Sequence, residues 1–492
     1  MVAPAPASSR RPFDASWLND FLPHYLTSAG SAMHAEMIGT LGGLSEHRGS
    51  RINRIAPRGS AKSTLASKAY PLWAAVEGRE PFALLLSDTE EQACSFLAAI
   101  KEELEGNETL RAAYPHAAGV GPVWKGAKVR LRNGCMIAAK GAGGRIRGLT
   151  NGTRRPTLIV VDDANKKEDA YSPTLRRRAL DWVAKDVMPA GEPGHTNFVA
   201  VGTAVHREAV VCDLARNPTW ETVAYKAIRV FPDRMDLWAE WERILFNLAD
   251  PDREEAADGY HAEHRADMDA GGELLWPERF PLDFLMKERA SLGASAFDSE
   301  YQDTPGTAGA TEWPADYFDR PDIWLAEWPD DLAGKAFYLD PSKGEGAKAG
   351  DYQAHCWGGW SRKLNALCIE ADLRREPTTD MVARAIATAQ AFGCPVTAET
   401  NGTMGLLMAE FERQSAGRMV GLQGIANTDA KLQRIRTLGP FLARGQVKIR
   451  PTPGGRMMVD QLRDVPGGEY DDGPDAASGL LRRVLTNLNG GR

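Results

Sequence analysis

Short apolar runs that alternate with longer helix-like stretches restrict the fold of this chain more than any other feature. Four such runs lie in the first part of the sequence, at 54–56, 82–86, 157–161 and 197–201. Between them, residues 90–105 and 173–187 have the pattern of helices. Because strands that alternate with helices are typical of a mainly parallel sheet, we predict an α/β domain here.

An acid-free stretch between His116 and Val161 interrupts this alternation. It contains Asn133-Gly134, a favoured hairpin turn, between the strand-like segments 129–131 and 136–139, so we expect a small antiparallel insertion. The stretch carries nine basic residues: Lys125, Lys128, Arg130, Arg132, Lys140, Arg145, Arg147, Arg154 and Arg155. They predict a surface that contacts DNA phosphates, with Arg145 and Arg147 as candidates, or else a solvated face whose counter-charges lie elsewhere.

The length of 492 residues exceeds what one hydrophobic core usually organises, so we expect two domains. For residues 1–30 we predict a loose arm followed by a helix at about 17–28. We expect the first domain to span residues 31–310. Within it, the acid-rich residues 233–273 predict surface helices and loops. Turn formers at 300–310 predict a connection between domains, with a linker at 311–330.

Residues 331–492 predict a second α/β domain. A helix-like stretch at 381–392 precedes the last of four strand-like runs, which lie at 335–339, 354–357, 366–369 and 395–398. Hydrophobic residues make up 43% of the chain and charged residues 25%, which is typical of globular proteins. The six cysteines form no CxxC pair, which argues against a zinc site or a disulfide framework. No apolar run approaches the roughly 18 residues of a membrane span, so we expect a cytoplasmic protein.

The segment Ala56-Pro57-Arg58-Gly59-Ser60-Ala61-Lys62-Ser63 has the position of a phosphate-binding loop, between a short strand and a helix-forming run. In such a loop backbone N–H groups and a helix N-terminus bind phosphates, Lys62 reaches the β and γ phosphates, and Ser63 holds magnesium. Ala56 and Ala61 replace the two glycines of the usual pattern. The predicted ATP-binding residues are Pro57, Arg58, Gly59, Ser60, Ala61, Lys62, Ser63 and Thr64.

Two carboxylates follow the apolar run 158–161, and the first of them, Asp162, is the predicted magnesium ligand. Asp163 and Glu168 are alternative candidates for the acid that polarises water, and each could instead be a helix N-cap or a loop carboxylate. Thr203 follows the run 197–201. We predict that it senses hydrolysis, with a simple strand-end turn as the alternative.

A second set of acids lies in the C-terminal region. Asp340 ends one apolar run, Glu399 follows a later one, and Asp471, Asp472 and Asp475 stand at the start of a helix. Acids on a first strand, a fourth strand and a terminal helix are the layout of RNase H-like nucleases, where they hold two divalent metals roughly 4 Å apart. Carboxylate oxygens suit Mg²⁺ or Mn²⁺. Asp472 and Asp475 share a helix face, although the helix dipole alone also favours acids there.

The loop 57–64, the segment Gly144-Arg145-Ile146-Arg147-Gly148 and the strand ending in Asp162 together resemble the large terminase family of tailed bacteriophages. Residues 275–278 and 297–302 also resemble the segment that joins the two terminase domains. The resemblance implies a P-loop NTPase domain followed by an RNase H-like nuclease domain. It further implies that Arg58 is an arginine finger supplied in cis, with Asp340, Glu399 and the 471–475 acids as metal ligands.

The same resemblance implies that the chain uses ATP with Mg²⁺ to move double-stranded DNA into a procapsid, and two divalent metals to cut concatemeric viral DNA. Expected partners are the portal protein, a small terminase subunit and further copies in a ring. The expected location is the host cytoplasm, transiently at the portal, and not the mature virion. Lys431 and Arg434, in a run that matches the family, either contact DNA or solvate a helix.

Two other functions fit parts of the sequence. A helicase-like or DNA-repair ATPase fused to a nuclease would have the same phosphate-binding loop. It should also carry a second ATPase-like domain with its own arginine finger, whereas residues 330–492 supply nuclease-like acids. A structural or portal-associated protein would require both acidic sites to be accidental.

Overall fold

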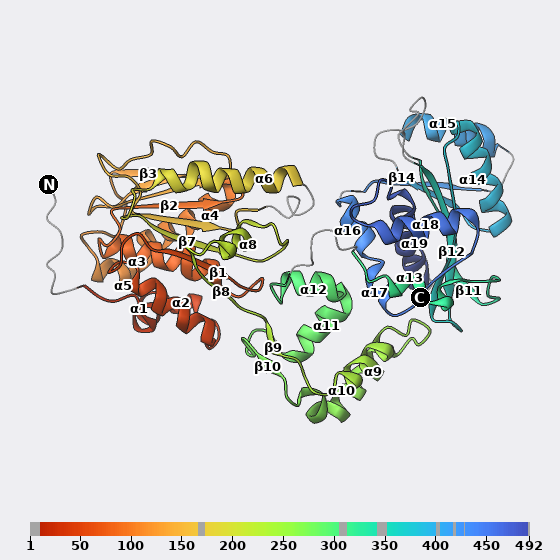
Figure 1. Cartoon of the computed structure of the whole chain (residues 1–492), viewed down its shortest axis with the longest axis horizontal. Coiled ribbons are helices and arrows are strands. Elements are labelled where there is room, and N and C mark those ends of the chain that lie inside the picture. The colour runs from red at the N-terminus through yellow and green to blue at the C-terminus, as the bar shows by residue number, and fades with distance from the viewer. Residues whose placement is uncertain are drawn as a thin grey trace. The chain divides into compact units, whose positions relative to one another are not determined.

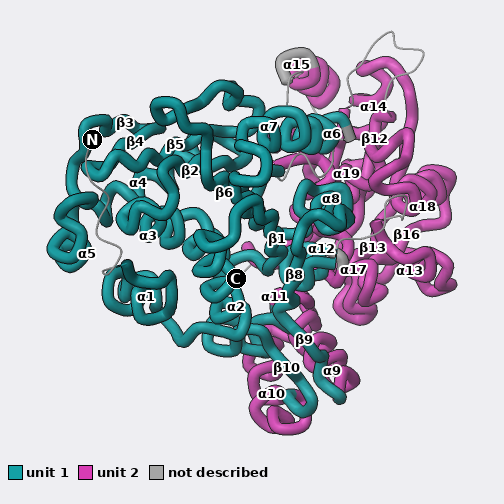
Figure 2. The backbone as a smooth tube through the Cα atoms, turned by 60° about the vertical axis from the view of Figure 1, so that its left-hand side comes forward, with its two compact units in different colours: residues 1–233, 269–287, 296–307 teal, residues 234–268, 288–295, 308–492 magenta. Residues whose placement is uncertain are grey.

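The computed structural model describes residues 10–165, 173–304, 312–341, 352–399, 404–416, 420–427 and 429–490. They form two compact units (Figure 2). Unit 1 comprises residues 1–233, 269–287 and 296–307, and unit 2 comprises 234–268, 288–295 and 308–492. The units therefore alternate along the chain, and the domain bounds 31–310, 311–330 and 331–492 stay a prediction.

Unit 1 is built on an eight-stranded sheet with the order β3-β4-β5-β2-β6-β7-β1-β8. Its strands are β1 (Arg51–Ile55), β2 (Phe82–Ser87), β3 (Val123–Lys125), β4 (Lys128–Arg130), β5 (Met136–Gly141), β6 (Leu158–Asp162), β7 (Asn197–Gly202) and β8 (Glu221–Ala224). The pairs from β5 to β8 are parallel, whereas β3, β4 and β5 pair antiparallel. The four predicted strands and the hairpin at Asn133-Gly134 are confirmed.

Helices cover both faces of this sheet. Alternate residues of the central strand β2 therefore lie in two different hydrophobic cores. Ala83 and Leu85 belong to one cluster and Leu84 and Leu86 to the other. The first cluster packs under α1 (Ala15–Phe21), α2 (Ala32–Gly43), η3 (Thr64–Ala69), α3 (Tyr70–Val76), α4 (Glu90–Gly106) and α5 (Glu108–Ala113). The second packs under α6 (Pro173–Trp182), η5 (Val183–Val187), α7 (Met188–Ala190) and α8 (Val210–Arg216). Figure 1 shows α6 above β2 and β7, and α1 and α2 below them.

The predicted loose arm lies largely outside the described residues, and the helix predicted at 17–28 is shorter and begins earlier. Helix α1 ends at Phe21, followed by the short η2 (Pro23–Tyr25). Pro23 accounts for this end, because the residue before a proline is disfavoured in the helical conformation. Trp17 and Phe21 are buried in the first core cluster of unit 1, so this segment is an integral part of the domain.

Unit 2 is built on a six-stranded sheet with the order β15-β14-β11-β12-β13-β16. Its strands are β11 (Leu332–Asp340), β12 (Gln353–Ser361), β13 (Ala366–Arg374), β14 (Val396–Glu399), β15 (Leu422–Ile425) and β16 (Val447–Ile449). The first three form an antiparallel meander, and the others pair parallel to their neighbours. The four predicted strands are confirmed, as is the helix predicted at 381–392.

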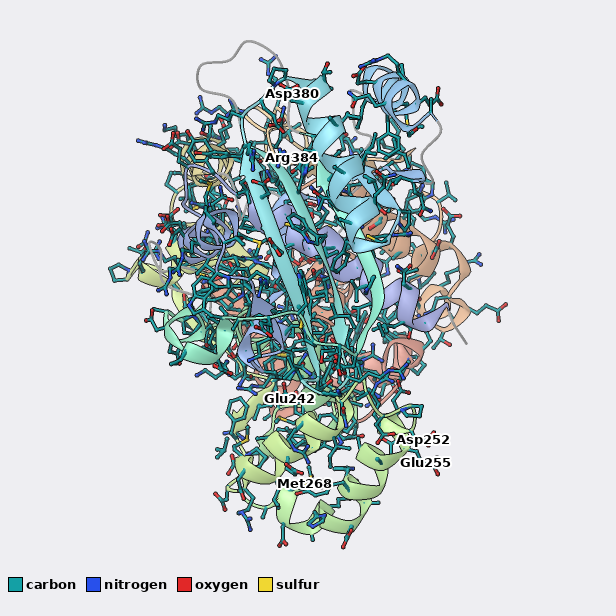
Figure 3. All side chains as sticks on the ribbon, turned by 90° about the vertical axis from the view of Figure 1, so that its right-hand side faces the viewer. Glu242, Asp252, Glu255, Met268, Asp380 and Arg384 are labelled. Atoms are coloured by element: carbon teal, nitrogen blue, oxygen red, sulfur yellow. The ribbon has the colours of Figure 1, made fainter. Side chains whose placement is uncertain are left out.

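Both faces of the second sheet are also covered. Phe337 and Leu339 on β11 enter a core with α14 (Thr378–Phe392) and α15 (Met404–Ser415). Tyr338 points to the other face, under α18 (Pro453–Asp464) and α19 (Asp472–Asn489). Two short helices, α16 (Lys431–Arg436) and α17 (Gly439–Ala443), precede β16. Figure 3 labels Asp380 and Arg384 in the first turns of α14.

Residues 225–330 contribute to both units. Unit 1 takes the antiparallel pair of β9 (Ile228–Val230) and β10 (Glu273–Leu274), whereas α9 (Met235–Leu245) and most of α10 (Arg253–Asp269), which lie between these strands in the sequence, belong to unit 2. Surface helices were expected here, and Figure 3 marks Glu242 on α9 and Met268 on α10. Helices α11 (Leu282–Leu292) and α12 (Ala294–Glu300) follow.

The interval predicted as a linker, 311–330, contains α13 (Asp316–Asp319) and η6 (Pro321–Ile323) in its described part. Trp313, Phe318 and Ile323 are buried in the main core of unit 2, so the described residues of this interval fold with that unit. None of the helices in the described ranges is long and apolar enough to cross a membrane.

Candidate active sites

Three adjacent strands of unit 1 bring the predicted motor residues together. The loop after β1 runs through Gly59 and Ala61, both in the left-handed backbone region, and the helical backbone begins at Lys62. Lys62 Nζ donates to Thr203 Oγ1 at 2.8 Å, at the end of β7. Ser63 Oγ donates to Asp162 Oδ1 at 3.0 Å, at the end of β6. The lysine, the hydroxyl and the acid predicted to bind nucleotide and magnesium therefore meet at one edge of the sheet.

Asp162 is almost completely buried, and its burial, together with the neighbouring Asp163, raises the pKa of the carboxyl above its ordinary value. Hydrogen bonds from Ser67 and Ser63 oppose this shift. Asp163 has a positive φ of 44° and accepts a hydrogen bond from the Thr203 backbone N–H at 3.1 Å. A buried acid that is held mainly by hydroxyl donors is suited to a magnesium ion, because a cation would stabilise its ionised form.

A cavity of 310 Å³ opens in front of these residues, within the usual range of small-molecule sites. Its lining includes six predicted or nearby polar residues, namely Arg58, Ser63, Asp162, Asp163, Thr203 and Glu300. Pro57, Ser60 and Thr64 lie in the same loop and helix start. Glu168, the alternative catalytic acid, falls outside the described residues.

Two acids near this cavity were not predicted as site residues. Glu300, at the end of α12, lies 3.6 Å from Arg58 in an ion pair, and its carbonyl accepts the Arg58 N–H at 3.0 Å. Asp303 Oδ1 accepts the N–H of Ala204 at 2.8 Å, directly after Thr203. Burial raises the pKa of Asp303 to about 7. The only sequence signal was the resemblance of residues 297–302 to a terminase segment, which marks no single residue.

His34 on α2 contacts the loop through the Ser60 carbonyl, and it was not among the predicted site residues. The Ser31 N–H donates to His34 Nδ1 at 2.9 Å, so Nε2 carries the proton and donates to the Ser60 carbonyl at 3.0 Å. Burial lowers the pKa of His34, which favours this neutral form. A neutral imidazole therefore fixes the loop backbone without adding charge.

The basic stretch retains both of its interpretations. Arg145 and Arg147 are exposed, as contact with DNA would require. Arg147 pairs with Asp186 at 2.8 Å, and Lys140 with Glu90 at 3.0 Å, as expected for a solvated face with counter-charges elsewhere. The role of Arg145 and Arg147 stays a prediction.

Unit 2 brings a second group of acids together at the ends of two neighbouring parallel strands. Asp340 ends β11 and Glu399 ends β14, one residue beyond the paired Leu339 and Ala398. With Asp475 in the first turn of α19, they place one carboxylate oxygen each within 4.8 Å of one another. Burial raises the pKa of Asp340 to about 7, against an opposing effect of Lys431. Three oxygens from hard ligands at this separation fit a Mg²⁺ or Mn²⁺ ion.

A close approach of α19 to β11 makes this convergence possible. A Cβ atom at Gly479 would collide with the ring of Tyr338, so only glycine allows the helix to lie this near the strand. The first turn of α19 is thereby brought to the end of β11. Asp472 lies outside the three-acid group, and its Oδ2 accepts the Tyr352 N–H at 2.8 Å.

Two cations of α16 contact the acids. Lys431 Nζ lies 2.6 Å from Asp471 Oδ1 and 2.9 Å from Asp472 Oδ1. Arg434 donates from Nε to Asp475 Oδ1 at 2.9 Å and from Nη2 to Oδ2, and it lies 3.7 Å from Glu399. The proposed DNA contacts of Lys431 and Arg434 stay a prediction, since both side chains pair with candidate metal ligands here.

Comparisons with known proteins give a structural likeness. No protein-family model matches the chain, and no curated protein matches it. The solved structures that it resembles are phage large terminases. One large terminase from a thermophilic bacteriophage is 10% identical over 96% of this chain and 100% of that chain, with a TM-score of 0.44. The HK97 bacteriophage large terminase is 11% identical over 91% of each chain, with a TM-score of 0.36.

The zinc-bound large terminase nuclease of thermophilic phage G20c is 16% identical over 34% of this chain and 98% of that chain, with a TM-score of 0.25. At these identities and TM-scores, we infer function only from the residues of the two sites themselves.

Proposed function

We propose that this chain is the large subunit of a phage DNA-packaging terminase, in which unit 1 hydrolyses ATP and unit 2 cuts DNA with divalent metal. The observation that carries the proposal is the presence of two separate acid sites of different chemistry. One combines a phosphate-binding loop with Lys62 and Asp162. The other gathers Asp340, Glu399 and Asp475.

In unit 1, the loop N–H groups and the helix that begins at Lys62 bind the phosphates, and Lys62 adds a positive charge at the β and γ positions. Ser63 and Asp162 would hold Mg²⁺, which would supply positive charge for the transferred phosphoryl group. Arg58 contributes to the same stabilisation, and Asp163 orients the attacking water. Thr203 contacts Lys62, which supports a sensor at the end of β7.

In unit 2, Asp340, Glu399 and Asp475 hold the divalent metal, while Asp471 and Asp472 are the remaining candidate ligands. When bound there, a divalent metal would supply an activated water and stabilise the leaving oxygen of the cut strand. The carboxylates fix its position, because each comes from a different rigid element of the fold. Such a site cuts DNA with little sequence preference unless other surfaces add one.

A helicase-like ATPase with a fused nuclease is the second candidate. It would need a second ATPase-like domain, whereas the sheet of unit 2 contains an antiparallel meander and carries acids at two parallel strand ends. That topology favours the packaging motor. The proposal extends to double-stranded DNA, the portal protein, a small terminase subunit and a homo-oligomeric ring as partners, in the host cytoplasm and transiently at the procapsid portal.

The proposal can be tested with the purified chain, supercoiled plasmid and Mg²⁺ or Mn²⁺, with and without ATP. We expect metal-dependent nicking without ATP, and ATP hydrolysis that increases when DNA and a small subunit are present. A forked duplex should not be unwound. Efficient unwinding would favour the helicase, and the absence of metal-dependent nicking would remove the nuclease assignment.

A further inference from the structure

Five candidate metal ligands of unit 2 face two cations that come from one short helix. Lys431 and Arg434 stand three residues apart on α16, so they share a face. The acids are Asp340, Glu399, Asp471, Asp472 and Asp475. Because acids at this density repel one another, the two cations are part of what makes the site stable without metal.

The two cations serve different acids. Arg434 pairs with Asp475 and lies near Glu399, and both of these acids belong to the three-acid group. Lys431 instead pairs with Asp471 at 2.6 Å and with Asp472 at 2.9 Å. The five acids therefore divide into a group of three, in which the Arg434 guanidinium holds Asp475, and a pair that holds the Lys431 ammonium.

Asp472 is the acid that most needs this ammonium. Its side chain is only 4% exposed, and its second oxygen accepts the Tyr352 N–H. A buried carboxylate that loses its counter-ion is strongly destabilising, so Lys431 can leave only if another cation takes its place. A divalent ion is the cation that the proposed nuclease function supplies.

We propose that Lys431 is the resident cation of the Asp471–Asp472 pair and competes with a second divalent ion there. The free protein then binds one divalent ion in unit 2, at Asp340, Glu399 and Asp475, and a second only where Lys431 is displaced. This inference rests on the proposed nuclease function. It replaces the expectation of two equivalent metal positions with two unequal ones, the three-acid group beside Arg434 and the Asp471–Asp472 pair that Lys431 occupies.

The test is calorimetric titration of the full chain with Mn²⁺, without nucleotide or DNA. Asp340→Asn serves as the reference, because unit 1 can also bind Mn²⁺ and is the same in both proteins. We expect the wild type to bind one ion more than Asp340→Asn. Lys431→Met should bind one ion more than the wild type, and its affinity for that ion should be at least tenfold higher than the wild type's affinity for any second ion in unit 2. Lys431→Arg should behave as the wild type.

Lys448→Met is the matched control, because Lys448 also pairs with an acid of unit 2, Asp322 at 2.8 Å, far along the chain from the candidate ligands. It should leave the titration unchanged. If Lys431→Met does not fold, Lys431→Gln keeps a hydrogen-bond donor without the charge. In EDTA the melting temperature of either variant should fall, and Mn²⁺ should restore it.

A wild type that already binds two ions in unit 2, or a Lys431 variant with unchanged ion number and affinity, would overturn the proposal. A lowered melting temperature that Mn²⁺ does not restore would do the same, because it would give Lys431 a structural role alone. Equal titrations of the wild type and Asp340→Asn would have another meaning, since they would remove the metal site of the proposed nuclease itself.

Discussion

The two acid sites of this chain stabilise buried carboxylates by different means. In unit 1, Asp162 is held by the hydroxyls of Ser63 and Ser67, and the lysine of the loop donates to Thr203. In unit 2, the acids are paired directly with Lys431 and Arg434. In unit 1 the lysine therefore donates to a threonine and not to the buried acid, whereas in unit 2 the cations pair with the acids themselves.

The difference implies that a metal ion can bind at Asp162 without breaking an ion pair. A metal ion in unit 2 competes with Lys431 and Arg434 for the acids. In the proposed function Mg²⁺ would enter unit 1 beside an acid that hydroxyl groups hold, where a cavity of about 310 Å³ opens in front of the loop. A divalent ion entering unit 2 must work against existing ion pairs, so its affinity depends on which side chains it displaces. The predictions below test each half of this contrast.

The largest effect is expected for Arg58→Ala in unit 1. The side chain is 60% exposed beside the cavity and should stabilise charge mainly in the transition state. Loss of an arginine finger typically lowers turnover by about 10³-fold or more, so we expect this fall in ATPase turnover with less than about a tenfold change in nucleotide affinity. Steady-state kinetics with Arg51→Ala as the control would check this, and equal losses in both quantities would assign Arg58 to ground-state binding.

Asp303→Asn should stabilise unit 1 increasingly as pH rises. The folded pKa of about 7 lies above that of an unfolded aspartate, so the folded state holds a proton that the unfolded state loses, and stability declines between about pH 4 and pH 7. Asparagine keeps the acceptor for Ala204 and tolerates the positive φ of 47°. Denaturation should give a gain of about 2 kcal/mol at pH 8 and less at pH 5. Asp213→Asn is the exposed control, and a gain that does not grow with pH would exclude a raised pKa.

Replacing Arg145 and Arg147 together with glutamine should weaken DNA binding by about tenfold at low salt and reduce the salt slope by about 2. Fluorescence anisotropy at several salt concentrations would measure both. The control is the pair Arg243→Gln and Arg413→Gln, since each of these arginines pairs with a glutamate on its own helix. An unchanged slope would mean that the basic stretch is only a solvated face.

The smallest effect is expected for Ala61→Gly. Ala61 has a positive φ of 61°, which costs a residue with a side chain about 1 kcal/mol or more, so glycine should raise stability by about 0.5–1 kcal/mol. Ala75→Gly is a matched control inside α3, where the same change should lower stability by about 1 kcal/mol. A loss of stability in both variants would show that the left-handed conformation at Ala61 is not strained.

The sequence predicts those elements whose buried residues follow one another directly along the chain. Strands such as β2 and β6 are buried on both faces, so they must be apolar runs, and an acid that directly follows such a run has a defined place at the sheet edge. This reasoning located Asp162, Asp340 and Glu399 at strand ends. It needs no knowledge of which strands are neighbours.

The remaining features depend on contacts between distant segments. Asp303 follows a helix rather than an apolar strand, and only the fold brings it to Ala204. The pairing of Lys431 with Asp472 joins residues 41 positions apart. Likewise, Arg444 pairs with Glu242 at 2.8 Å, a contact of α9 with the region after α17 that no local pattern reveals.

The central claim is that one chain carries two independent active sites, and crossed variants test it most directly. Lys62→Ala and Asp340→Asn should each be assayed for ATP hydrolysis, with DNA and a small subunit present, and for Mn²⁺-dependent plasmid nicking. Lys68→Ala and Asp330→Asn serve as matched controls. The account predicts that Lys62→Ala loses hydrolysis and keeps nicking, and that Asp340→Asn does the reverse with an intact melting transition. Retained hydrolysis in the first variant, or retained nicking in the second, would contradict it.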